Sequence, residues 1–141
     1  MTEISSTTVV LDTNIVLDLW LYLDLATPAL LEAITSQRVD WVATQAMRDE
    51  LARVLTYPHI VARMHQGGLL AEDVLAQFDQ YARVVPVAER APYVCKDVDD
   101  QKFIDLACAY AGALVSKDKA VLTMRNRLSR VGVDVFAAWA H

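Results

Sequence analysis

The chain contains few of the residues that mark several protein classes. Its 141 residues include four glycines, four prolines and two cysteines. Cys95 and Cys108 fit neither a disulfide framework nor a zinc-ligand pattern, which predicts reduced thiols and a cytoplasmic protein. No stretch of about 18 uncharged apolar residues occurs, so we expect no membrane-spanning helix. With 55% hydrophobic residues, the composition predicts one ordered domain over residues 1–141.

The chain also lacks the excess of basic residues that nucleic-acid-binding proteins usually carry. It has 18 acidic residues against 13 lysines and arginines, which gives a net charge of −5. If four of the 18 acids bind metal ions, 14 remain against 13 bases, and the rest of the chain is nearly neutral. Bound divalent cations would then supply the positive charge that a phosphate needs. The acidic balance is therefore compatible with nucleic-acid chemistry.

Apolar runs and turn residues alternate along the chain and predict strands followed by helices. The predicted strands are 7–11, 39–43, 83–87, 113–116 and 133–136. The predicted helices are 15–22, 28–36, 45–55, 59–65, 70–82, 101–111 and 118–128, with Gly112 ending the sixth. This alternation predicts an α/β fold with a largely parallel sheet.

Carboxylates follow the predicted strands at the edge where parallel α/β sheets bind ligands. The candidates are Asp12 and Asp118 directly after strands, Glu50 on the helix after the second strand, and Asp97, Asp99 and Asp100 before the helix 101–111. Carboxylates gathered in one place repel each other and are costly to bury unless a cation compensates them. Hard oxygen ligands favour Mg²⁺ or Mn²⁺ over zinc. The pattern therefore indicates a metal site suited to phosphate substrates.

Each of these carboxylates also has a purely structural interpretation. Aspartate is among the best N-cap residues, so Asp12 and Asp118 each suit the start of a helix. One of the three aspartates before the helix 101–111 is expected to serve only as a cap or as a partner of the helix dipole. Glu50 by itself suits a solvated helix face. The shared position of these residues at strand ends favours the metal-ligand interpretation.

Four segments, in this order, resemble the motifs of the PIN domain family and span almost the whole chain. They are Val9-Val10-Leu11-Asp12-Thr13-Asn14, Met47-Arg48-Asp49-Glu50-Leu51, Cys95-Lys96-Asp97-Val98-Asp99-Asp100-Gln101-Lys102-Phe103 and Val115-Ser116-Lys117-Asp118-Lys119. The resemblance is closest to the VapC-like toxin components of bacterial toxin–antitoxin pairs. That subgroup has Asp-Pro-Asp-Asp where this chain has Val98 in place of the proline, which leaves open which of the three aspartates is the ligand.

The resemblance implies a three-layer α/β/α fold with a mainly parallel sheet of four to five strands, and a nuclease that hydrolyses RNA phosphodiester bonds. The implied catalytic residues are Asp12, Glu50, Asp100 and Asp118. The implied ligands of Mg²⁺ or Mn²⁺ are Asp12, Asp100 and Asp118. The implied supporting residues are Asn14, Asp97, Asp99 and Ser116. Asn14 would position the first loop or a water, and Ser116 would bind a carboxylate or the substrate phosphate.

Contacts to the substrate and to other proteins are less strongly indicated. The expected contacts to the RNA backbone are Arg125, Arg127 and Arg130, although ordinary solvated arginines look the same in sequence. The apolar run from Leu17 to Leu23 is broad for one helix face and predicts a homodimer or partner surface on which Trp20 is exposed. An antitoxin protein is a further partner that the resemblance implies.

Three functions remain open at this point. The first is an Mg²⁺- or Mn²⁺-dependent endoribonuclease that acts as the toxin of a toxin–antitoxin pair. The second is a protein-interaction module with the same fold and a weak or lost active site. The third is a phosphatase or phosphotransfer receiver, for which Lys117 or Lys119 would be the required lysine. The presence of all four acidic positions favours the endoribonuclease.

Overall fold

Five parallel strands form one sheet in the order β3-β2-β1-β4-β5. The computed structural model describes residues 7–23 and 27–139. The strands are β1 (Thr7–Leu11), β2 (Val39–Ala43), β3 (Arg83–Val84), β4 (Ala113–Val115) and β5 (Asp134–Phe136). The predicted α/β class with a mainly parallel sheet is confirmed.

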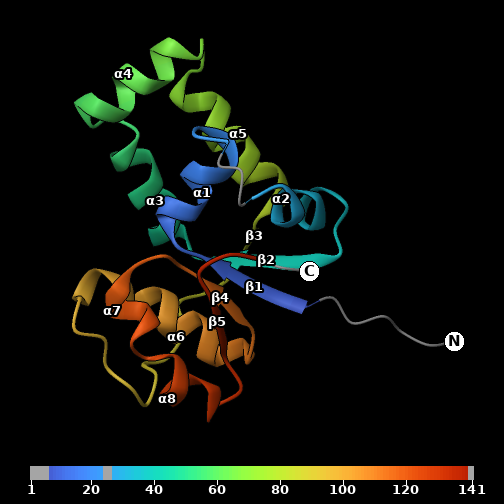
Figure 1. Ribbon diagram of the computed structural model, residues 1–141, viewed down its shortest axis with the longest axis vertical. Helices are drawn as coiled ribbons and strands as arrows, with labels where there is room; N and C mark the ends of the chain where they lie inside the picture. Colours follow the sequence, from blue (N-terminus) through green and yellow to red (C-terminus); the bar gives the residue numbers. More distant parts are fainter. Residues whose placement is uncertain (1–6, 24–26, 140–141) are drawn as a thin grey trace, which may run out of the picture.

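Helices cover both faces of this sheet. They are α1 (Thr13–Trp20), α2 (Pro28–Thr35), α3 (Gln45–Val54), α4 (Pro58–Gln66), α5 (Ala71–Tyr81), α6 (Gln101–Tyr110), α7 (Lys119–Leu122) and α8 (Arg125–Ser129), with a 3₁₀ turn, η1 (Val98–Asp100), before α6. Figure 1 shows α1 to α5 on one side of the strands and α6 to α8 on the other. None of the helices in the described ranges is long and apolar enough to cross a membrane. The three-layer α/β/α arrangement is thus confirmed.

The central strand β1 determines where the sheet can bind a ligand. Its β-branched and apolar residues Val9, Val10 and Leu11 are buried, and the strand pairs with β2 on one side and β4 on the other. The chain runs outward from β1 through β2 to β3, and then continues on the opposite side with β4 and β5. The direction of winding therefore reverses between β1 and β4, and such a switch point leaves a crevice at the carboxyl ends of the strands.

Two elements are shorter than the sequence predicts. The strand predicted over 83–87 ends at Val84, and the N–H of Val85 donates to Ala43 O (2.8 Å) before Pro86, which has no N–H for the ladder. The helix predicted over 118–128 is divided into α7 and α8. At the break, the backbone N–H of Met124 donates to Val121 O (2.9 Å), and the Thr123 hydroxyl donates to Ala120 O (3.0 Å). The side chain of Thr123 thus replaces a backbone donor of the helix.

The turn between α6 and β4 differs from the predicted one. Ala111, rather than a glycine, takes the left-handed conformation that ends α6, with φ of 47°. Gly112 has another role, because a Cβ atom there would lie 2.6 Å from the carbonyl oxygen of Thr8. The absence of a side chain at Gly112 therefore lets the start of β4 lie close against β1.

The apolar run of α1 packs inside the domain. Leu17, Leu19 and Leu21 are buried, and Trp20 is half-buried with its ring 5.6 Å from that of Trp41. Only Leu23 at the end of the predicted run is strongly exposed. The prediction of an exposed apolar helix face is therefore wrong for most of the run, since the run lies between the sheet and the other helices. Homodimer formation stays a prediction.

Candidate active site

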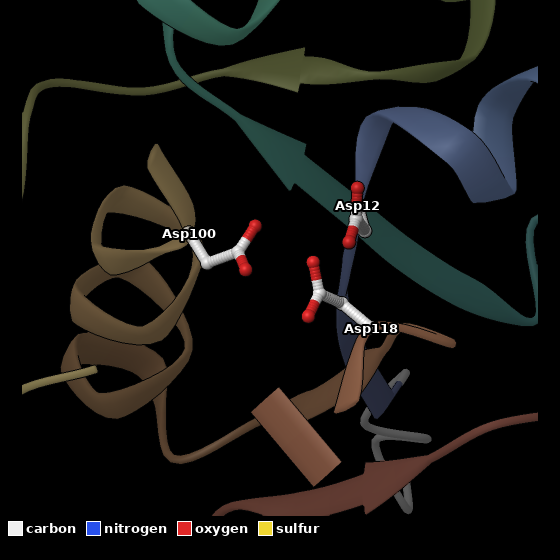
Figure 2. A group of neighbouring side chains, drawn as sticks. All are labelled: Asp12, Asp100 and Asp118. Carbon is white, nitrogen blue, oxygen red and sulfur yellow. The ribbon is translucent and has the colours of Figure 1, made fainter. Parts of the chain in front are cut away.

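Three aspartates from distant parts of the chain meet at the carboxyl edge of β1 and β4. Asp12, Asp100 and Asp118 each offer a carboxylate oxygen, and these oxygens all lie within 4.8 Å of one another. Figure 2 shows the three side chains pointing toward one another from the end of β1, the start of α6 and the loop after β4. Asp12 and Asp100 are each 6% exposed. The cluster is thus a largely buried group of three carboxylates.

Ser116 links two of these aspartates. Its buried hydroxyl donates to Asp12 Oδ2 (2.8 Å) and accepts from the backbone N–H of Asp118 (3.1 Å). The other oxygen of Asp12 accepts from the backbone N–H of Asn14 (3.2 Å), and Asp118 Oδ1 accepts from that of Ala120 (2.8 Å). Asp12 and Asp118 therefore cap α1 and α7 while they also face the cluster. The N-cap interpretation and the metal-ligand interpretation are thus compatible. Asn14 contributes its backbone, and its side chain is exposed.

The structure separates the three neighbouring aspartates before α6. Asp97 caps the 3₁₀ turn, since its Oδ1 accepts from the backbone N–H of Asp99 (3.0 Å). Asp97 and Asp99 are exposed, and Asp100 alone joins the cluster. Val98, which stands where the family subgroup has proline, is 80% exposed. The substitution at Val98 therefore leaves Asp100 at the position that the resemblance implies.

The electrostatics of the cluster are unfavourable without a cation. Asp100 Oδ2 is buried and, within the described part of the chain, has no hydrogen-bond partner. The pKa of Asp100 is raised from 3.8 to about 7, first by burial, then by a side-chain hydrogen bond with Asp118 and by the charges of Asp12, Asp118 and Asp97. Burial also raises the pKa of Asp12. A hard divalent cation would supply the missing partner, so the all-carboxylate donor set fits Mg²⁺ or Mn²⁺.

Glu50 on α3 lies beside the cluster but contacts other groups. Its Oε1 accepts from Lys102 Nζ (2.6 Å), and its Oε2 accepts from the Thr13 hydroxyl. Its charge contributes to the raised pKa of Asp12, after burial and the charge of Asp118. Thr13 and Lys102 were absent from the predicted site. Their only sequence signal is their position, because Thr13 follows Asp12 directly and Lys102 comes two residues after Asp100.

The predicted RNA-contacting arginines lie on or next to α8. Arg125, Arg127 and Arg130 are all exposed, and Arg125 Nε donates to Val135 O (3.1 Å) on β5. Their role in RNA binding stays a prediction. Lys117, one of the two candidate lysines for a phosphotransfer receiver, forms an ion pair with Asp18.

A comparison with protein families gives a match that includes the whole candidate site. The model of the PIN domain matches residues 8–120, which run from β1 to α7. Among curated proteins, none matches the chain. PIN domains are in general metal-dependent nucleases, and the cluster of Asp12, Asp100 and Asp118 is compatible with that chemistry. The match covers more than half of the chain, in agreement with the fold, and this protein therefore belongs to the PIN domain family.

Proposed function

We propose that this PIN domain is an endoribonuclease that hydrolyses RNA phosphodiester bonds with Mg²⁺ or Mn²⁺. The observation that carries the proposal is a buried oxygen of Asp100, within a carboxylate cluster, that has no donor among the described residues. A purely structural group of three aspartates would be expected to satisfy its buried oxygens with protein donors. An unsatisfied carboxylate oxygen in a crevice at the switch point of the sheet supports a metal site.

The side chains of the site have distinct tasks in this proposal. Asp12, Asp100 and Asp118 would hold the cation, which when bound lowers the pKa of a water and stabilises the charge that develops on the phosphate. Ser116 keeps Asp12 and Asp118 in a fixed relative position through its two hydrogen bonds. This support reduces the reorganisation that the carboxylates need when the cation and the substrate bind.

The biological setting forms a separate part of the proposal. We propose a cytoplasmic toxin that is inhibited by an antitoxin protein and acts as a homodimer. Contacts to the RNA backbone would come from the exposed arginines Arg125, Arg127 and Arg130. The support for this setting is the resemblance of Asp97-Val98-Asp99-Asp100 to the toxin subgroup together with the membership of the PIN family.

A cleavage assay on end-labelled single-stranded RNA tests the proposed activity. The wild-type protein is expected to cleave the RNA with Mn²⁺ and to be inactive with EDTA. Asp12→Asn should lower the rate at least about a hundredfold, because it removes a metal-ligand charge. Asp49→Asn is the matched control, since Asp49 is an exposed carboxylate on α3 that accepts from Gln45.

Two outcomes would contradict the proposal. Cleavage by Asp12→Asn at the wild-type rate would show that the aspartate cluster takes no part in the reaction. A wild-type protein that neither cleaves RNA nor gains thermal stability from millimolar Mn²⁺ would favour the interaction-module function. DNA of the same sequence, assayed in parallel, tests whether the nuclease is specific for RNA.

A further inference from the structure

The carboxylate of Glu50 already has a donor on each of its oxygens. Lys102 Nζ lies 2.6 Å from Oε1, and the Thr13 hydroxyl donates to Oε2. The side chain of Glu50 is 16% exposed. Asp100, by contrast, has a buried oxygen to which no group of residues 7–23 or 27–139 donates. The acidic residues of the site therefore fall into two kinds: three aspartates that face one another, and one glutamate that is paired with a lysine.

Lys102 is fixed beside the aspartate cluster by contacts to three neighbours. Its ammonium group donates to Glu50 Oε1 and to the backbone oxygen of Asp99, both at 2.6 Å, and lies 4.9 Å from the ring centroid of Phe103. Asp99 directly precedes Asp100, so the ammonium is tied to the turn that presents Asp100 to the cluster. The two hydrogen bonds use two of the three N–H bonds of the ammonium, and 29% of the side chain is exposed. The third donor is available to a ligand.

A single divalent cation removes most of the negative charge of the aspartate cluster. Glu50 forms an ion pair with Lys102, and the exposed Arg53 lies 4.0 Å from the same Oε1, so the charge of Glu50 is already compensated. The three aspartates carry a charge of −3 when ionised, which one divalent cation reduces to −1. A second divalent cation on Glu50 would lie next to the ammonium of Lys102, which is 2.6 Å from Oε1, and the two positive charges would repel each other.

We propose that this site binds one divalent cation and that the ammonium of Lys102 is the second positive charge of the site. In this arrangement Glu50 is no metal ligand, and it holds Lys102 in place together with Asp99 O. The third N–H of Lys102 donates to a non-bridging oxygen of the phosphate. The inference rests on the proposed function, since it assigns the second cation of that same site.

Mn²⁺ titration, by calorimetry and by the electron paramagnetic resonance of free Mn²⁺, tests the number of metal ions. The wild-type protein is expected to bind one Mn²⁺. Glu50→Gln should also bind one, with a Kd within about threefold of the wild-type value, because its amide oxygen can still accept from Thr13 or Lys102. Asp100→Asn should weaken binding about a hundredfold or more, because it removes a metal-ligand charge. The stoichiometry and the Kd of Mn²⁺ are thus measured independently of RNA cleavage.

RNA cleavage by Lys102 variants tests the second positive charge. Lys102→Met keeps the apolar stem over Phe103 and removes the ammonium. It should leave Mn²⁺ stoichiometry at one and lower kcat/KM about tenfold to a hundredfold, the usual effect of losing a charge-assisted hydrogen bond. Lys102→Arg should restore part of this loss. Lys96→Met is the matched control, because Lys96 is an exposed lysine of the segment before η1, and it should cleave at the wild-type rate.

The outcomes separate this inference from the proposed function. Two Mn²⁺ ions in the wild-type protein, or a tenfold weaker Mn²⁺ Kd in Glu50→Gln, would make Glu50 a metal ligand and overturn the inference, while the nuclease proposal would stand. Wild-type cleavage by Lys102→Met would also overturn it. Failure of the wild-type protein to bind any Mn²⁺ would instead refute the metal site itself, and with it the proposed function.

Discussion

Replacing Asp100 by asparagine should make the metal-free protein more stable. The pKa of Asp100 is about 7 in the folded protein against 3.8 as its ordinary value, so the folded state binds a proton more tightly than the unfolded state does. The stability that this proton contributes is fully present below about pH 4 and is lost as the pH rises through 7. An asparagine side chain carries no charge at any of these pH values. Asp100→Asn therefore avoids the loss of folding stability that the wild-type protein undergoes as the pH rises through 7.

The size of the effect follows from the pKa shift. At about 1.4 kcal/mol per pKa unit, the change from 3.8 to about 7 costs the folded protein on the order of 4 kcal/mol at pH 8. The amide of asparagine needs partners of its own, so we expect a gain of about half this amount, roughly 2 kcal/mol. For a domain of 141 residues the entropy of unfolding is about 0.3 kcal/mol per degree, so Tm should rise by about 7 °C.

Differential scanning calorimetry in EDTA at pH 5 and pH 8 measures this gain. The Tm difference between Asp100→Asn and the wild-type protein should be small at pH 5 and largest at pH 8. Asp99→Asn is the control, since Asp99 is an exposed carboxylate next to Asp100 and should give no such gain. A lower Tm for Asp100→Asn at pH 8, or a difference that does not change with pH, would refute the assignment of unfavourable charge to Asp100.

Mn²⁺ should reverse the order of the two proteins. A ligand present at about a hundred times its Kd stabilises the folded state by about 2.7 kcal/mol. The wild-type Tm should therefore rise by about 9 °C in saturating Mn²⁺. Asp100→Asn should show little change at the same concentration. An equal Mn²⁺ effect on both proteins would place the metal elsewhere.

Three further substitutions test the support of the site. Ser116→Ala should weaken Mn²⁺ binding about tenfold to a hundredfold, because Asp12 loses its hydroxyl donor; titration of the folded variant measures this. Gly112→Ala should lower the free energy of unfolding by about 1–3 kcal/mol, because its Cβ would meet Thr8 O. Urea denaturation measures this change, and a free energy of unfolding equal to that of the wild type would contradict the close approach. Ala111→Gly should raise that free energy by up to about 1 kcal/mol in the same assay, because Ala111 has a positive φ.

The fold was predictable because the strands carry strong local signals. Val9, Val10 and Leu11 form an apolar, β-branched run, and the structure buries them at the centre of the sheet. Thr44, a favourable N-cap residue, directly precedes the third predicted helix, and its hydroxyl accepts from the backbone N–H of Met47. The break after α7 was not predictable, since Val121, Met124 and Leu128 have the spacing of one continuous helix and are all buried.

The aspartates of the site were predictable, but the surroundings of the fourth acidic residue were not. Asp12 and Asp118 follow strands of a parallel sheet, so their meeting follows from topology alone. The position of Glu50 within its site depends on the orientation of α3 relative to α6, which no local pattern determines. For that reason the sequence could indicate a glutamate near the cluster but could not show that Lys102 and Thr13 contact it.

The close approach at Gly112 offers a way to separate active from inactive chains of this type by sequence. Gly112, Ser116 and Asp118 lie on one short segment and have two different roles. Gly112 serves the backbone contact to β1, whereas Ser116 and Asp118 serve the carboxylate cluster. A related chain that keeps the glycine but has lost the serine and the aspartate would retain the architecture without the chemistry. Such a chain is the kind in which an interaction module should be sought.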